Sequence, residues 1–279
     1  MMLSLFKPCL GDESEAANLP QPKPPRNRCR DGGAVVASPK VRAAVGRARA
    51  SRRDNGPPAS PTRMETIAVI DFETTGKSPS GGGRATEIAV VLVEGETIVA
   101  RFQSLVNSGA WVPPFIEQLT GISNRMLQTA PPARAVMHDV ARFTRGCPLV
   151  AHNAAFDRAY WCAEMALAEV GDGEPAAMAC TVLLARRLYP QAPNHRLGTL
   201  AAWHALPDTG RAHRALADAE TTAHLLLRMR SDVRARFAAE LGTADVSHAL
   251  LAAMQRCSIA KLSDCVRQRC AAPGEPVPA

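Results

Sequence analysis

One stretch constrains the fold of this chain more than any other, the run Thr-Ile-Ala-Val-Ile-Asp-Phe-Glu-Thr-Thr-Gly at residues 66–76. Its apolar first half is rich in β-branched residues, which is typical of a buried central strand. Because successive side chains of a strand point to opposite faces, we expect Asp71 and Glu73 on one face and Phe72 on the other. Two carboxylates on one face of a rigid strand are suited to hard divalent cations such as Mg²⁺ or Mn²⁺.

Charge is unevenly distributed along the 279 residues. Residues 1–63 hold 12 Lys and Arg against 5 Asp and Glu, whereas residues 64–279 hold 21 of each kind. The formal net charge of +7 therefore belongs to the first segment, and it does not indicate that the rest of the surface is basic. That segment is rich in Pro, Arg, Ala and Gly and has little apolar periodicity, so we predict a disordered basic arm.

Cysteine usage and hydropathy indicate the cellular compartment. The eight cysteines include no Cys-x-x-Cys pair and no Cys/His spacing typical of metal sites. Reduced thiols in a cytoplasmic protein are therefore expected. No apolar run approaches the roughly 20 residues that cross a bilayer, and the N-terminus has no signal-peptide core, so no association with a membrane is predicted.

The order of the elements predicts an α/β fold, a mixed sheet of about five strands flanked by helices. Residues 86–93 and 97–102 flank a Glu-Gly-Glu turn and are expected to form a hairpin that continues the first strand as a meander. A short buried strand at 147–151 follows. Helices are predicted at about 131–145, 154–170, 181–188, 196–206 and 213–229. Trp161 and Trp203 lie among apolar residues of these helices and are expected in the core.

Three further chemical groups lie near the ends of elements. Asp157 and Asp218 fall in the first turns of helices, where the helix dipole alone favours an acid. His213 could by itself be an exposed loop histidine. Together with Asp71 and Glu73, however, they form a set of acids and one imidazole at element ends. This joint pattern favours a chemical role over separate structural ones.

Five blocks of sequence follow one another along the chain. They are Asp-Phe-Glu-Thr-Thr-Gly at 71–76, Leu-Thr-Gly-Ile at 119–122, His-Asn-Ala-Ala-Phe-Asp at 152–157, His-Arg-Leu-Gly-Thr-Leu at 195–200 and His-Arg-Ala-Leu-Ala-Asp-Ala at 213–219. With these blocks the chain resembles the DEDDh 3′→5′ exonucleases, which include the proofreading ε subunit of bacterial DNA polymerase III and ribonuclease T. The resemblance covers about residues 64–230 and implies a ribonuclease H-like fold. It leaves residues 231–279 as a helical extension with a loose C-terminal tail.

The resemblance also implies roles for the acids and the histidine. Two divalent metal ions, Mg²⁺ or Mn²⁺, would be held by Asp71, Glu73, Asp157 and Asp218, with Asp71 bridging them. Zn²⁺ is disfavoured because the ligands are carboxylates. His213 would take the proton of the attacking water, since an imidazole is largely neutral at working pH.

Contacts with the substrate are expected beside these residues. The backbone around Thr74 and Thr75 could hydrogen-bond the terminal 3′-hydroxyl group. Leu119 or Phe156 could wedge against terminal bases, although Phe156 is as compatible with a place in the core. The implied substrate is a single-stranded or frayed 3′ end of a nucleic acid.

Three functions remain open at this point. The first is a DNA exonuclease of proofreading or repair that releases nucleoside 5′-monophosphates, which we favour because residues 71–76 and 119–122 look most like ε sequences. The second is an exoribonuclease similar to ribonuclease T or oligoribonuclease, since the same carboxylates would serve RNA. The third is a module that recruits a polymerase or repair partner through residues 1–63 or 231–279, its nuclease activity being dispensable. In each case we expect a bacterial cytosolic protein associated with the nucleoid.

Overall fold

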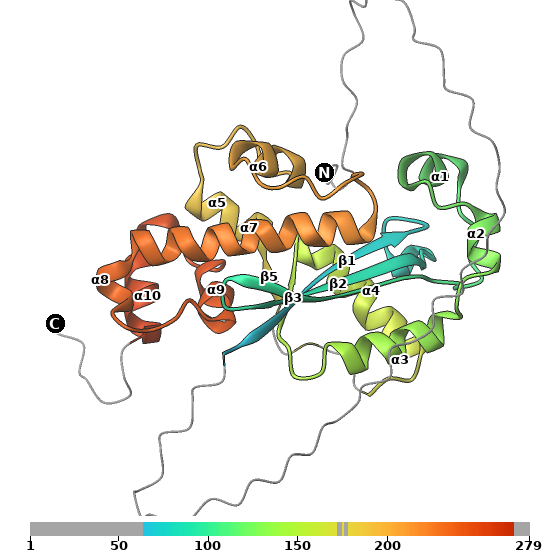
Figure 1. Ribbon diagram of the computed structural model, residues 1–279, viewed down its shortest axis with the longest axis horizontal. Coiled ribbons are helices and arrows are strands. Elements are labelled where there is room, and N and C mark those ends of the chain that lie inside the picture. The colour runs from blue at the N-terminus through green and yellow to red at the C-terminus, as the bar shows by residue number, and fades with distance from the viewer. Residues whose placement is uncertain (1–63, 172–174, 176–177, 271–279) are drawn as a thin grey trace, which may run out of the picture. The chain divides into compact units, whose positions relative to one another are not determined.

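The computed structural model describes residues 64–171, 175 and 178–270, and the predicted disordered arm and loose tail lie outside them. The described residues form a mixed sheet in the order β3-β2-β1-β4-β5 with helices on both sides (Figure 1). The predicted α/β fold is therefore confirmed. The strands are β1 Thr66–Thr74, β2 Ala85–Glu94, β3 Thr97–Leu105, β4 Leu149–Ala151 and β5 Met178–Cys180.

The run that opened the sequence analysis forms the central strand. β1 pairs antiparallel with β2 along its whole length and parallel with β4 on its other side. Its side chains divide between two apolar cores, as their alternation predicts. Ile67 and Val69 belong to one core, and Ile70 and Phe72 to the other. Asp71 therefore leaves the strand on the face of Val69, and Phe72 anchors the opposite face.

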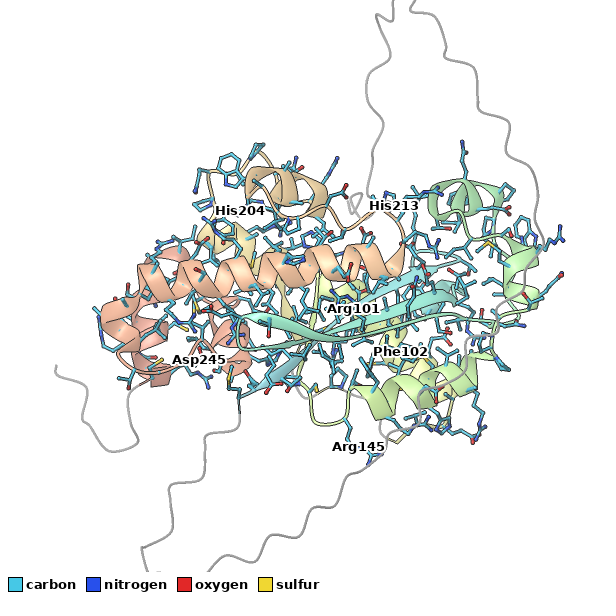
Figure 2. The ribbon with its side chains drawn as sticks, viewed as in Figure 1. Arg101, Phe102, Arg145, His204, His213 and Asp245 are labelled. Carbon is cyan, nitrogen blue, oxygen red and sulfur yellow. The ribbon has the colours of Figure 1, made fainter. Side chains whose placement is uncertain are left out.

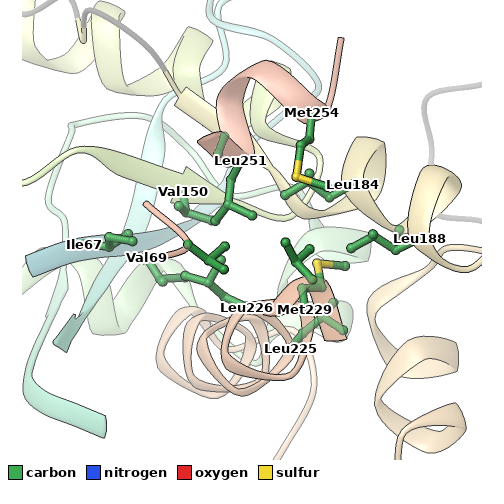
Figure 3. Packing of buried hydrophobic residues seen from close by; sticks show 14 of the residues in the cluster. Ile67, Val69, Val150, Leu184, Leu188, Leu225, Leu226, Met229, Leu251 and Met254 are labelled. Atoms are coloured by element: carbon green, nitrogen blue, oxygen red, sulfur yellow. The ribbon is translucent and has the colours of Figure 1, made fainter. Parts of the chain in front are cut away.

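The helices cover the two faces of the sheet. α7 lies along one face, over β1 and β2, and α3 and α4 lie on the other (Figure 1). Leu225, Leu226 and Met229 of α7 belong to the same apolar core as Ile67 and Val69 of β1 (Figure 3). The helices are α1 Pro114–Thr120, α2 Asn124–Gln128, α3 Ala133–Phe143, α4 Ala154–Leu167, α5 Thr181–Leu188, α6 Leu197–Trp203, α7 Ala215–Arg236, α8 Ala238–Leu241, α9 His248–Met254 and α10 Leu262–Cys270, and 3₁₀ turns lie at Pro79–Gly81 and Ile259–Lys261.

The strand β5 is an element for which the sequence pattern assigned no position. It has only three residues and pairs parallel with β4 at the edge of the sheet. The side-chain amide of Gln255, just beyond α9, substitutes for a further strand. Its Oε1 accepts the Cys180 N–H at 2.6 Å, and its Nε2 donates to the Met178 carbonyl at 3.1 Å. Such pairing blunts an edge that would otherwise be open to another chain.

The helices after residue 230 pack on the sheet rather than apart from it. α7 continues without a break to Arg236, and apolar residues of α9 and α10 belong to the same core as Ile67. His248 Nε2 lies 2.9 Å from the Leu149 carbonyl, and its backbone N–H donates to Glu65 Oε2 at 2.7 Å. The predicted domain boundary at residue 230 stays a prediction, but α7 crosses it as one helix.

One predicted core residue is exposed. Trp161 is buried as expected, whereas 46% of the Trp203 surface is accessible. Trp203 is the last residue of α6, a helix of only seven residues whose buried side chains are Leu197 and Leu200. Trp203 therefore lies beyond the face that packs on the core. Within the part of the chain that the structure describes, no helix is both long and apolar enough to span a membrane.

Candidate active site

The acids of β1 lie at the C-terminal end of the central strand. Asp71 is 8% exposed and Glu73 is half-buried. Both leave the strand on the face covered by α7, because Asp71 and Glu73 keep the alternation of Ile67 and Val69. The two carboxylates thus share one face of a strand that its pairing with β2 and β4 holds rigidly.

Asp157 reaches the same strand from the opposite side of the sheet. β4 runs parallel to β1 and leads directly into α4, so the first turn of this helix lies near the C-terminal end of β1. The Asp157 side chain is in that turn and is 2% exposed. Its Oδ1 accepts the backbone N–H of Phe72 at 3.2 Å. Asp157 is therefore bonded to the residue between Asp71 and Glu73.

His213 and Asp218 come to Glu73 from the N-terminal end of α7. Each of these three residues offers a ligand atom, and the three atoms lie within 4.8 Å of one another. The His213 backbone N–H donates to Asp218 Oδ2 at 3.3 Å, which ties the residue to the first turn of the helix. Figure 2 shows His213 at this end of α7, next to the tip of the sheet.

This donor set fits a divalent metal ion. Carboxylate oxygens are the ligands that hard cations such as Mg²⁺, Mn²⁺ and Ca²⁺ prefer. Glu73, His213 and Asp218 already converge at distances that one ion can bridge. Asp71 lies two residues before Glu73 on the same face of β1, and Asp157 of α4 is bonded to the Phe72 N–H between them. The sequence-predicted acids and imidazole therefore come from three separate elements to one end of the sheet.

The comparisons with known proteins agree with this arrangement. Residues 68–226 match the family described as Exonuclease, the RNase T family. The match covers more than half of the chain and includes the four acids Asp71, Glu73, Asp157 and Asp218 together with His213. The chain belongs to the DEDDh 3′→5′ exonuclease family. Members of this family use divalent metal ions.

Curated relatives of this DEDDh chain are much longer proteins. It is 36% identical over 171 residues to the 3′-5′ exonuclease DinG of Bacillus subtilis, a match that covers 61% of this chain and 18% of the relative. It is 39% identical over 169 residues to DNA polymerase III PolC-type of the same organism, covering 60% of this chain and 12% of the relative. It is 34% identical to a DNA polymerase III subunit epsilon-like protein of Rhodobacter capsulatus, covering 63% of this chain and 25% of the relative.

Solved structures share the fold at lower identity. The nuclease domain of 3′hExo, a DEDDh family member bound to rAMP, aligns with a TM-score of 0.53 at 21% identity, covering 61% of this chain and 94% of that one. A zinc-bound complex of Escherichia coli ExoI with single-stranded DNA aligns with a TM-score of 0.50 at 16% identity, covering 62% and 41%. These likenesses show that the DEDDh chain has the fold of the family.

The residues predicted to contact substrate differ in their surroundings. The Thr74 hydroxyl donates to the Gly76 carbonyl at 2.8 Å, and the Thr75 hydroxyl accepts the Arg84 N–H at 3.0 Å. Both side chains thus serve the turn after β1, and the Thr75 backbone N–H is engaged as well, donating to the Arg84 carbonyl at 2.9 Å. Leu119 on α1 is 45% exposed. Phe156 is half-buried, and its ring centroid lies 5.0 Å from that of Tyr160.

Sequence reasoning missed buried polar groups around the site. The Tyr160 hydroxyl donates to the Gly76 carbonyl at 2.8 Å, and His152 Nδ1 lies 2.8 Å from the Thr181 hydroxyl. Glu87 and Glu164 are buried and paired with arginines. For Glu87 a signal existed, because one acid interrupts an otherwise apolar strand. A buried charge of that kind requires a partner.

Proposed function

We propose that this protein is a metal-dependent 3′→5′ exonuclease that hydrolyses DNA from its 3′ end and releases nucleoside 5′-monophosphates. The observation that carries the proposal is the convergence of Glu73, His213 and Asp218 within 4.8 Å at the end of β1. A phosphodiester is anionic, so hydrolysis needs positive charge near the attacking and departing oxygens and a base for the water. The carboxylates at this site could hold metal ions that supply the charge, and the His213 imidazole could serve as the base.

The acids and the histidine take different parts in this reaction. Asp71, Glu73, Asp157 and Asp218 would hold two Mg²⁺ or Mn²⁺ ions, which when bound make the water nucleophilic and neutralise the leaving oxygen. His213 accepts the proton of the attacking water at its imidazole. The bond from its backbone N–H to Asp218 Oδ2 keeps this imidazole beside the acids. Asp157, held by the Phe72 N–H, keeps α4 against β1.

Recognition of the terminal nucleotide is proposed at the turn after β1 and at α1. Leu119 offers an exposed apolar side chain against which a base can stack or wedge. Phe156 is better explained as packing for Tyr160, which in turn holds the turn at Gly76. The backbone around Thr74 and Thr75 stays the proposed contact of the 3′-hydroxyl group, apart from the Thr75 N–H, which donates to the Arg84 carbonyl.

DNA is favoured over RNA by the names of the relatives above 30% identity. They include polymerases of the PolC type and an ε-like polymerase subunit. The likeness to 3′hExo supports only the fold, and RNA stays the alternative substrate. A polymerase or repair partner is an independent proposal, supported by the same names. The part that matches PolC is 12% of that protein.

The deciding experiment compares 5′-labelled single-stranded DNA and RNA of the same sequence with Mg²⁺, for the wild type and Asp71→Ala. Stepwise loss of DNA from its 3′ end, absent in the variant and abolished by EDTA, supports the proposal. Asp264→Ala, an exposed acid on α10, is the control and should cleave like the wild type. A strong preference for RNA would move the protein to RNA processing. Absence of cleavage of both would favour the interaction module.

A further inference from the structure

Two buried acids outside the metal-ligand set have the same surroundings. Glu87 on β2 and Glu164 on α4 both have side chains that are 1% exposed. Each accepts two bonds from the guanidinium fork of one arginine and one bond from the backbone N–H that follows this arginine. For Glu164 the partners are Arg84 and Ala85, with all three distances at 2.9 Å. Bidentate bonds of this kind fix direction as well as distance.

Glu87 lies next to the proposed metal ligands. In the antiparallel ladder it stands directly opposite Glu73, so both side chains project from the same face of the sheet. It accepts Arg214 Nη2 at 2.8 Å and Nε at 3.1 Å, the Ala215 N–H at 3.0 Å and Gln103 Nε2 at 2.7 Å. Its carboxylate is thus fully engaged by donors and is left with no role in binding a metal ion.

The partners of Glu87 are the residues that join His213 to its helix. Arg214 is the N-cap residue of α7, and its own side chain makes no capping bond. Glu87 caps the helix from the sheet instead, by accepting the Ala215 N–H that would otherwise be an orphan donor. Asp218 is in the same first turn of α7. The position of that turn relative to Glu73 is therefore defined by Glu87.

His213 itself has a backbone conformation that needs support. Its φ is +60°, in the left-handed region that residues other than glycine seldom adopt. Such residues persist where the surrounding structure determines them. Here the support comes from both sides, since the His213 N–H is bonded to Asp218 and Arg214 is held by Glu87.

We infer that Glu87 and Arg214 are positioning residues, which hold the His213 backbone and the first turn of α7 so that His213 and Asp218 face Glu73. This inference rests on the proposed nuclease function. Neither residue needs to touch substrate or metal ion. The Arg84–Glu164 pair joins β2 to α4, the helix of Asp157, in the same manner. Both helices that carry an acid of the site are thus tied to β2.

The test uses Glu87→Gln, Arg214→Lys and Arg214→Gln in the full chain. Arg101→Gln is the matched control, because Arg101 on β3 pairs with Glu220 and also ties α7 to the sheet, away from His213. We expect kcat on single-stranded DNA to fall at least about tenfold in Glu87→Gln with KM nearly unchanged, since small displacements of reacting groups cost this much. Arg214→Lys should retain more activity than Arg214→Gln, because it keeps the charge and loses only the fork.

A second readout is independent of turnover. Binding of Mn²⁺, followed by the paramagnetic resonance signal of the free ion, should weaken severalfold in Glu87→Gln and stay unchanged in Arg101→Gln. Thermal unfolding of each variant shows whether it is folded under the assay conditions. Should Glu87→Gln not fold, Arg214→Lys carries the test, since the Arg214 side chain is already 33% exposed.

Two outcomes would overturn the inference. The first is that Glu87→Gln and Arg101→Gln lose the same amount of activity and bind Mn²⁺ equally. The second is a rise in KM with unchanged kcat in the Arg214 variants, which would show that Arg214 contacts the substrate phosphate. A wild type that is inactive on DNA and RNA, yet binds Mn²⁺ in a manner that depends on Glu87, would refute the proposed function and leave the positioning role standing.

Discussion

At the scale of single residues, His213 combines a chemical group with an unusual backbone. A left-handed residue costs about 1–3 kcal/mol when it is not glycine, and asparagine and histidine tolerate this region better than most residues. His213 therefore adopts a backbone conformation that would be unfavourable for a histidine without a role. Its bond to Asp218 and the 4.8 Å convergence with Glu73 give a reason, because this conformation directs the imidazole to the acids.

The substitution His213→Asn tests the role of the imidazole without changing the backbone. Asparagine suits the left-handed conformation, so the fold and the bond to Asp218 should persist. We expect kcat to fall by about 10²–10⁴-fold, the usual contribution of a general base. Turnover of single-stranded DNA is the measurement, and His138→Asn, an exposed position on α3, is the control. Near-normal turnover in His213→Asn would reject His213 as the base.

At the scale of elements, two short pieces depend on side chains distant in sequence. β5 has three residues, and the side-chain amide of Gln255 is hydrogen-bonded to its outer edge. α7 begins at Ala215, whose backbone N–H is capped by the carboxylate of Glu87. In both cases a side chain supplies bonds that the local backbone cannot make, and this explains why local sequence alone is a poor guide to these ends.

Replacing Gln255 by alanine should destabilise the fold. The Cys180 N–H and the Met178 carbonyl would lose their buried partner, and each unsatisfied buried group costs about 1–3 kcal/mol. Urea unfolding should therefore give a lower free energy of unfolding, with activity per folded molecule unchanged. Gln268→Ala, at an exposed position on α10, should leave this free energy within experimental error. An unaltered stability for Gln255→Ala would show that water replaces the amide.

The cap on α7 should make stability depend on pH. Burial alone raises the pKa of Glu87, but the bonds from Arg214, the Ala215 N–H and Gln103 outweigh it and lower the pKa below its ordinary value. A lowered pKa means that the stabilisation is present above the unfolded pKa of about 4.3. It is lost as the pH falls through the lower folded value.

Unfolding by urea at neutral and acidic pH measures this effect. The free energy of unfolding of the wild type should decrease as the pH falls below the pKa of an unfolded glutamate. Glu87→Gln should be less stable at neutral pH and lose less on acidification, because its side chain does not titrate. Parallel pH curves for the two proteins would contradict the role of Glu87.

At the scale of the whole molecule, the described residues beyond the family match complete the core. The match ends at residue 226, yet Leu250, Leu251 and Met254 of α9 pack with β1 and α7 in one apolar cluster (Figure 3). Burial of such side chains is worth about 1.5–3 kcal/mol each. The helices α8 to α10 are thus part of the folded unit, whatever else they bind.

Removal of residues 238–279 should therefore abolish stable folding rather than only a partner site. We expect low solubility and loss of the cooperative unfolding transition, because the truncation exposes one side of the main core. Removal of residues 1–62 is the comparison, and the predicted disordered arm should be dispensable for the melting temperature. A soluble and cooperative protein without residues 238–279 would show that the remaining core suffices.

The central strand, the alternation of Asp71, Phe72 and Glu73, and the family of the fold could all be predicted from the sequence alone. Each of these depends on local periodicity or on motifs written along one segment, so it can be read without coordinates. The same alternation held in the structure, where Phe72 enters one core and Asp71 leaves toward the other.

Contacts between groups distant in sequence, in contrast, follow from tertiary packing and not from any local pattern. The pairing of Glu87 with Arg214 spans 127 residues, and that of Gln255 with Cys180 spans 75. Neither leaves a periodic trace, because each depends on the register of the sheet and on how a helix packs over it. The exposure of Trp203 was decided in the same way, by the length of α6 and by the face that it presents to the core.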